Sequence, residues 1–144
     1  MSESLLVARI AGERVAFPIS AVSTTTMLEQ VYPVPGAPAF VAGLMANRSQ
    51  TLTVIDTVRA LELETQGEPP EYCIVFVRGG CSYAFAVDAI EAVVETTGEL
   101  APPRGKLAAG WQRAALGQIE TTGGTMLVVD WEKLLSAPQQ LAAA

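Results

Sequence analysis

The sequence contains no histidine among its 144 residues. Histidine supplies the general base in Ser-His-Asp and Cys-His nucleophile pairs, and it is a common zinc ligand. These catalytic classes and HExxH-type zinc sites are therefore excluded. The chain also lacks GxGxxG and GxxxxGK[ST] motifs, which are the sequence signals of phosphate-binding loops. We expect no catalytic residues, no cofactor and no metal.

Charge is scarce as well. Charged residues make up 17% of the chain, against about 25% in a typical soluble protein. The net charge is −6, and an acidic chain is repelled by phosphate backbones and by anionic lipids, so we expect no nucleic-acid partner. The low charge content favours either strands that are buried on both faces or an exposed apolar contact surface.

Cysteine is nearly absent, and membrane-directing segments are not recognisable. Cys73 and Cys81 flank Gly79-Gly80, a predicted hairpin turn that pairs Cys73 with a residue well past Cys81, so no disulfide is expected. The N-terminal residues lack a basic signal-peptide region. Prolines and glycines interrupt the longest uncharged stretch, residues 30–47. We expect a cytoplasmic protein without direct membrane insertion.

The chain contains an internal repeat. Residues 12–22 and 80–90 share a glycine, an Ala-Phe pair and two β-branched residues at the same spacing, and each segment follows an apolar run. Each copy is therefore predicted to be strand, glycine turn, strand. Phe17 and Phe85 occupy equivalent positions and are expected to pack inside two equivalent units.

A second pair of segments repeats in the same order. Gly43 stands thirteen residues before Asp56, and Gly117 stands thirteen residues before Asp130. Each Asp directly follows a β-branched run and is predicted to cap a short helix. A catalytic dyad is the alternative, but the repeat already explains both residues. Residues 34–43 predict a turn and one helical turn ended by Gly43. Short strands with glycine turns, duplicated once, predict an all-β fold of two small packed barrels.

The ordered motifs resemble the CheW-like domain family. They comprise Pro-x-x-Pro-Ala-Phe-Val-x-Gly at residues 35–43, Arg48, Val-Ile-Asp at residues 54–56, and the segment at residues 83–88. The resemblance implies two SH3-like five-stranded barrels with a shared core and a few short helices. It implies one domain at 4–137, whose half-repeats span approximately 4–66, with C-terminal exchange, and 71–137. Residues 138–144 are expected to form a flexible tail.

The resemblance also implies a function. Members of this family are non-catalytic adaptors that couple the cytoplasmic tips of chemoreceptors to the CheA histidine kinase. A groove between the barrels takes the helical hairpin of the receptor, and the barrel ends meet the regulatory domain of the kinase. We therefore expect a CheA-type regulatory domain and a chemoreceptor tip as partners.

The same resemblance implies five partner-contact residues, Val22, Thr24, Gly43, Asn47 and Arg48. Arg48 aligns with the arginine of the family's Asn-Leu-Arg-Gly segment, although this chain has Ala-Asn-Arg-Ser at residues 46–49. Thr24 stands where the family commonly has glutamate. The alternatives are a solvated loop residue for Arg48, an ordinary strand position for Thr24 and a core position for Val22.

Two further functions remain open at this stage. The first is a diverged CheW-like protein that serves another two-component kinase or restrains array assembly. The second is a small-ligand-binding protein or enzyme that uses the groove between the barrels. The absence of histidine and of a convergent polar cluster counts against the second.

Overall fold

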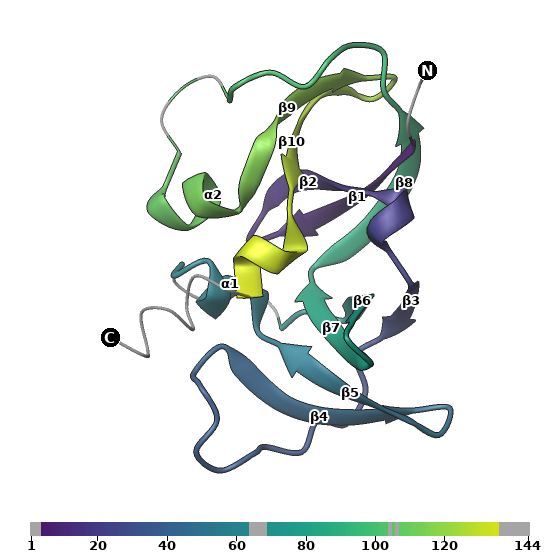
Figure 1. Cartoon of the computed structure of the whole chain (residues 1–144), viewed down its shortest axis with the longest axis vertical. Helices are drawn as coiled ribbons and strands as arrows, with labels where there is room; N and C mark the ends of the chain where they lie inside the picture. The colour runs from purple at the N-terminus through teal and green to yellow at the C-terminus, as the bar shows by residue number, and fades with distance from the viewer. Residues whose placement is uncertain (1–3, 64–68, 104, 106, 136–144) are drawn as a thin grey trace.

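The computed structural model describes residues 4–63, 69–103, 105 and 107–135, so the expected tail at 138–144 lies outside the described residues. Figure 1 shows two groups of strands, one above the other, accompanied by a few short helices. The strands are β1 (Ser4–Ile10), β2 (Glu13–Pro18), β3 (Thr24–Met27), β4 (Val41–Asn47), β5 (Gln50–Ile55), β6 (Tyr72–Arg78), β7 (Cys81–Val87), β8 (Ala89–Glu95), β9 (Ala115–Thr121) and β10 (Gly124–Val129). The helices are η1 (Ile19–Ala21), α1 (Thr57–Ala60), α2 (Ala109–Ala114) and a turn of helix at 131–135.

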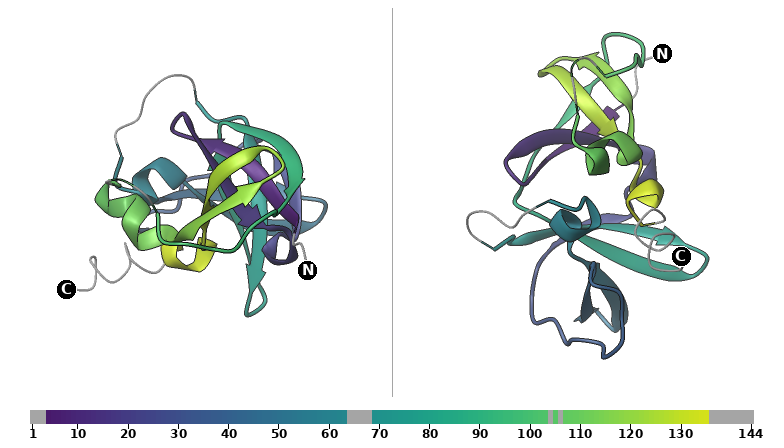
Figure 2. Two further views of the ribbon diagram at one scale, coloured as in Figure 1. Left: turned by 90° about the horizontal axis from the view of Figure 1, so that it is seen from above. Right: turned by 90° about the vertical axis from the view of Figure 1, so that its left-hand side faces the viewer.

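The strands form two five-stranded sheets with matching topology. Their orders are β8-β1-β2-β10-β9 and β3-β6-β7-β5-β4, so the β1–β2 and β6–β7 hairpins occupy the same places in the two sheets. In each sheet one neighbouring pair is parallel, β2 with β10 and β5 with β7. Each sheet combines one of these hairpins with three strands from the other half of the repeat (Figure 2). The prediction of an all-β fold with two five-stranded units and few helices is confirmed.

Four of the described hairpins close through two-residue turns, and three of these turns have the same backbone conformation. The turn residues Ala11-Gly12, Arg48-Ser49 and Gly79-Gly80 all have positive φ angles, as type I′ turns require. The Gly79-Gly80 turn places Cys73 opposite Ala86, and Cys81 opposite Arg78. Both cysteines are free thiols.

The repeated glycines, Gly43 and Gly117, lie at equivalent bulges in β4 and β9. Their φ angles are +151° and +153°. A Cβ atom on Gly43 would lie 2.3 Å from the carbonyl oxygen of Tyr32, and one on Gly117 would lie 2.5 Å from that of Ala101. The helical turn predicted to end at Gly43 was wrong, because β4 begins at Val41 and Gly43 lies inside it. The glycine instead permits close backbone approach within the sheet.

This close approach brings the edges of each sheet together. Tyr32, which follows edge strand β3, exchanges backbone hydrogen bonds of 2.8 and 2.9 Å with Leu44 in β4. In the other sheet, Ala101 exchanges equivalent bonds of 2.8 and 2.7 Å with Gln118 in β9. The edge strands of both sheets are thus partly covered by the chain itself.

The core has three layers. A large cluster lies between the two sheets, and each sheet carries one smaller cluster on its opposite face. Phe76 is the centre of the large cluster, since its ring stacks on Trp131 at a centroid distance of 5.0 Å and contacts Phe17 and Phe85 at 5.4 and 5.5 Å. Phe17 and Phe85 therefore pack between the two units and not inside each one. The central strands are buried on both faces, which explains much of the low charge content.

The two aspartates of the repeat cap helices, as the sequence predicts. The Asp56 carboxylate accepts a 3.2 Å hydrogen bond from the backbone N–H of Arg59 at the start of α1. The Asp130 carboxylate accepts a 3.0 Å bond from the N–H of Glu132. Each carboxylate thereby satisfies a backbone donor that the helix itself leaves unpaired.

Substitution of either aspartate tests this role. We expect Asp56→Ala and Asp130→Ala each to lower the free energy of unfolding by about 1 kcal/mol, because the cap acceptor is lost. Asp56→Asn is the matched control, since an asparagine side-chain oxygen still accepts the bond and should preserve most of the stability. Urea denaturation measures both changes, and an unaltered midpoint in Asp56→Ala would contradict the capping role.

Candidate functional site

The expected contact residues Asn47 and Arg48 lie together at one end of the second sheet. Arg48 is exposed in the turn between β4 and β5, and Asn47 is the last residue of β4. The turn directs the chain straight back along β5, so Arg48 stands at the tip of a hairpin. Gly43 is in the same strand but is buried against Tyr32. The close approach of the Tyr32 backbone alone explains why a glycine stands at position 43.

Thr24 lies in strand β3 of this sheet, and Val22 lies just before that strand. Val22 ends helix η1, is partly buried and packs against the core between the sheets. Thr24 is exposed in β3 and pairs with Val75 of β6. Strands β3 and β4 are the two edges of the sheet, and no side-chain hydrogen bond or ion pair within the described chain joins these two residues to Asn47 or Arg48. The five candidates therefore form two groups.

The outer face of β4 is apolar and uncharged. Ala42, Leu44 and Ala46 are exposed along it, and Tyr32, which is 60% exposed, lies beside Leu44, which is 37% exposed. The equivalent face of β9 instead carries Leu116, Gln118 and Glu120. Because the duplicated fold does not demand apolar residues here, the β4 face has the character of a contact surface.

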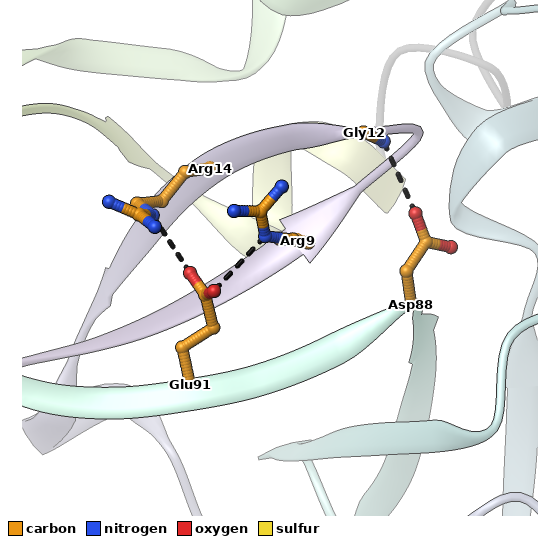
Figure 3. A network of polar contacts seen from close by, with 5 residues as sticks. All are labelled: Arg9, Gly12, Arg14, Asp88 and Glu91. Atoms are coloured by element: carbon orange, nitrogen blue, oxygen red, sulfur yellow. Dashed lines mark hydrogen bonds and ion pairs between the residues drawn. The ribbon is translucent and has the colours of Figure 1, made fainter.

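A charged network that the sequence did not reveal lies on the first sheet (Figure 3). The Nε atoms of Arg9 and Arg14 donate hydrogen bonds of 3.0 and 2.8 Å to the carboxylate of Glu91 in β8. The hydrogen bond from Arg9, together with the one from Arg14 and the charges of both guanidinium groups, lowers the pKa of Glu91. The Ala11-Gly12 turn places Arg9 opposite Arg14, so the like-charged pair was the available signal that a carboxylate lies nearby.

The described residues assemble no recognisable reaction centre. No group of three or more Cys, Asp or Glu side chains is placed to hold a metal within the described part of the chain. Burial raises the pKa of the Cys73 thiol to about 12, and a thiol with so high a pKa is a poor nucleophile near neutral pH. Among the helices described, none is both long enough and apolar enough to cross a membrane.

The fold places the chain among small all-β modules built from two five-stranded sheets over a shared core. The family model of the CheW-like domain matches residues 4–139. The protein therefore belongs to the CheW-like domain family.

Comparison with solved structures agrees with this assignment. The crystal structure of the scaffolding protein TtCheW from Thermoanaerobacter tengcongensis matches with a TM-score of 0.79, over 95% of this chain and 94% of that chain. The sequence identity is 18%, so this likeness shows the shared fold. No curated protein sequence matches the chain at a significant level.

Proposed function

We propose that this protein is a cytoplasmic, non-catalytic chemotaxis adaptor that couples chemoreceptors to a CheA-type histidine kinase. The observation that carries the proposal is the match to the CheW-like domain over residues 4–139. The structural relative is itself described as a scaffolding protein. A family of adaptors fits a chain whose described residues offer contact surfaces and no assembled reaction centre.

The proposed receptor surface is the β4–β5 hairpin with the apolar face of β4. Leu44, flanked by the small residues Ala42 and Ala46, offers an apolar surface to a helix. The Arg48 guanidinium at the hairpin tip would donate to carboxylates or carbonyls at the receptor tip. The regulatory domain of the kinase is proposed to bind separately, at the ends of the two five-stranded units.

Arg48→Ala tests this assignment. We expect it to weaken binding to a soluble receptor-tip bundle by roughly 1–3 kcal/mol, because a charge-assisted contact is lost. The free energy of unfolding should change by no more than about 0.5 kcal/mol, since Arg48 is exposed. Binding to the kinase regulatory domain should be nearly unchanged. Isothermal titration against each partner gives both affinities.

Arg59→Ala is the matched control, because Arg59 is an exposed arginine of α1 and lies outside the hairpin. It should bind the receptor tip as the unaltered protein does. Equal receptor affinity for Arg48→Ala and the unaltered protein would mean that Arg48 is a solvated turn residue without a receptor contact. Loss of both affinities together with a lower melting temperature would make its role structural.

A second candidate function is a diverged adaptor for another two-component kinase, or one that restrains array assembly. The observation that favours it is the exposed, uncharged Thr24 at the position where the family commonly has glutamate. A pull-down with a CheA regulatory domain and a receptor tip separates the two functions. Retention of neither partner would favour the second candidate.

A further inference from the structure

A hollow of about 200 Å³ lies on the first sheet, on the face that carries the smaller apolar cluster of that sheet. Val7, Val94 and Met126 form its apolar floor, and all three belong to that cluster or pack against it. Arg14 and Glu91 line the hollow as well, and both side chains are partly exposed. An apolar floor beside a few charged groups is the usual composition of a site for a small molecule.

The alternation of side chains along the strands turns two arginines toward this floor. Arg9 faces Arg14 across the β1–β2 hairpin. Because alternate residues of a strand share a face, Arg9 lies on the same face as Val7, and Arg14 lies on the same face as Ala16. Val7 and Ala16 both belong to the smaller cluster. The two guanidinium groups therefore stand beside the hollow and not beside the large core between the sheets.

Glu91 holds both arginines without using their terminal nitrogens. It is the extra residue of a β-bulge, since the pairing of β8 with β1 passes from Ala92 directly to Ile90, and a bulge can re-aim a side chain. Its carboxylate accepts from the Nε atoms of Arg9 and Arg14, and Figure 3 shows no bond from their terminal nitrogens. These nitrogens are the donors that best match a further carboxylate. Two guanidinium groups and one carboxylate leave one net positive charge beside the hollow.

The internal duplication shows that the fold does not require these charges. The second sheet keeps apolar residues, Val75 and Leu52, at the repeat positions of two floor residues, and both lie in its own smaller cluster. It does not keep the charge, because Ser82 stands at the repeat position of Arg14. The positive charge is therefore a property of the first sheet alone, and it lies in a chain whose net charge is −6.

We propose that this hollow binds a small carboxylate with a short, branched apolar body, such as 4-methylpentanoate. The apolar body would lie against Val7, Val94 and Met126. The carboxylate would accept from the terminal nitrogens of Arg14, whose guanidinium is held in place by Glu91. The net positive charge disfavours a cation, and a small inorganic anion would leave the apolar floor exposed to water. The inference does not depend on the adaptor function.

Three probes test the two parts of this ligand separately. 4-Methylpentanoate has both the acid and the branched body, 4-methylpentylamine has the same body with the opposite charge, and acetate has the acid without the body. In a titration of the full chain followed by NMR, we expect 4-methylpentanoate to bind most tightly and to shift the methyl signal of Met126. The methyl signal of Met45, which is buried in the smaller cluster of the second sheet, is the internal reference and should not move.

Arg14→Gln and Arg78→Gln form a matched pair of variants. Each removes an ion pair with one glutamate, and both arginine side chains are 48% exposed. Arg14 lines the hollow, whereas Arg78 belongs to β6 of the second sheet. We expect Arg14→Gln to weaken 4-methylpentanoate binding by about tenfold or more, the size of a lost charge-assisted contact, and Arg78→Gln to leave it unchanged.

Ala92→Leu tests the apolar floor without altering a charge. Ala92 is exposed, lines the hollow and stands opposite Val7 in the β1–β8 pairing. The larger leucine side chain would occupy the space that the apolar body of the ligand needs. We expect this variant to lose 4-methylpentanoate binding while its melting temperature stays that of the unaltered protein.

Each of four results would overturn the proposal. They are no binding of 4-methylpentanoate at millimolar concentration, equal loss of its affinity in Arg14→Gln and Arg78→Gln, unaltered affinity in Ala92→Leu, and binding that leaves the Met126 signal unmoved. If Arg14→Gln weakens association with the kinase regulatory domain while no probe binds the unaltered protein, the hollow belongs to a protein interface and the proposal is rejected.

Discussion

Replacement of Gly43 by alanine is expected to lower the free energy of unfolding by about 3 kcal/mol or more. The added Cβ would lie 2.3 Å from the carbonyl oxygen of Tyr32 and 2.8 Å from the Val31 side chain, and the φ of +151° is unfavourable for any residue with a side chain. The main obstacle is backbone, so the site cannot relax by a rotamer change. Chemical denaturation measures the effect.

Gly12→Ala separates the two sources of this cost. Gly12 also has a positive φ, +82°, but a Cβ there meets no atom within 4 Å. It should therefore cost only about 1–2 kcal/mol, the cost of placing a Cβ in the left-handed backbone conformation. Similar losses in the two variants would contradict the close approach at Gly43. A large loss at Gly43 also means that weaker partner binding by Gly43→Ala would reflect unfolding and not a lost contact.

Replacement of Phe76 by alanine is expected to cost about 3–5 kcal/mol, the range for deleting a large buried aromatic side chain. Phe76 is fully buried and contacts Phe17, Phe85 and Trp131, so its removal leaves a cavity between the two sheets. Because both sheets line this core, unfolding should remain a single transition that is shifted to lower temperature.

Val77→Ala is the control for this substitution. Val77 is the next residue of the same strand, but it is 51% exposed, and the change should alter stability by no more than about 0.5 kcal/mol. Circular dichroism and intrinsic fluorescence should report the same melting temperature for Phe76→Ala. Two separate transitions, one for each sheet, would contradict the shared core.

The sequence predicted the features that local chemistry dictates. The repeated Ala-Phe segments and the equally spaced Gly43–Asp56 and Gly117–Asp130 pairs indicated a duplicated all-β fold, because a repeat preserves spacing wherever strands must align. The caps at Asp56 and Asp130 followed from the residue type and from its place after a strand. These inferences needed only neighbouring residues along the chain.

Features that depend on distant residues were not predictable in the same way. Gly43 was assigned to the end of a helical turn because a glycine that ends a helix and a glycine at a bulge look alike in sequence. The place of Phe17 between the sheets depends on which face of β2 meets the other sheet. The contact of Arg14 with Glu91 joins residues from the two halves of the repeat. The facing arginines could indicate that a carboxylate lies nearby, but no local pattern identifies Glu91 as that carboxylate.

The exchange of strands between the halves has a consequence for how the chain folds. The parallel pairing of β2 with β10 joins Val15 to Leu127, so the first hairpin cannot complete its sheet until nearly the whole chain has been synthesised. Contacts between residues so far apart slow folding, because the intervening chain must be ordered first. During translation the unpaired side of β2 stays open to other strands. The growing chain is therefore most exposed to aggregation before β10 leaves the ribosome.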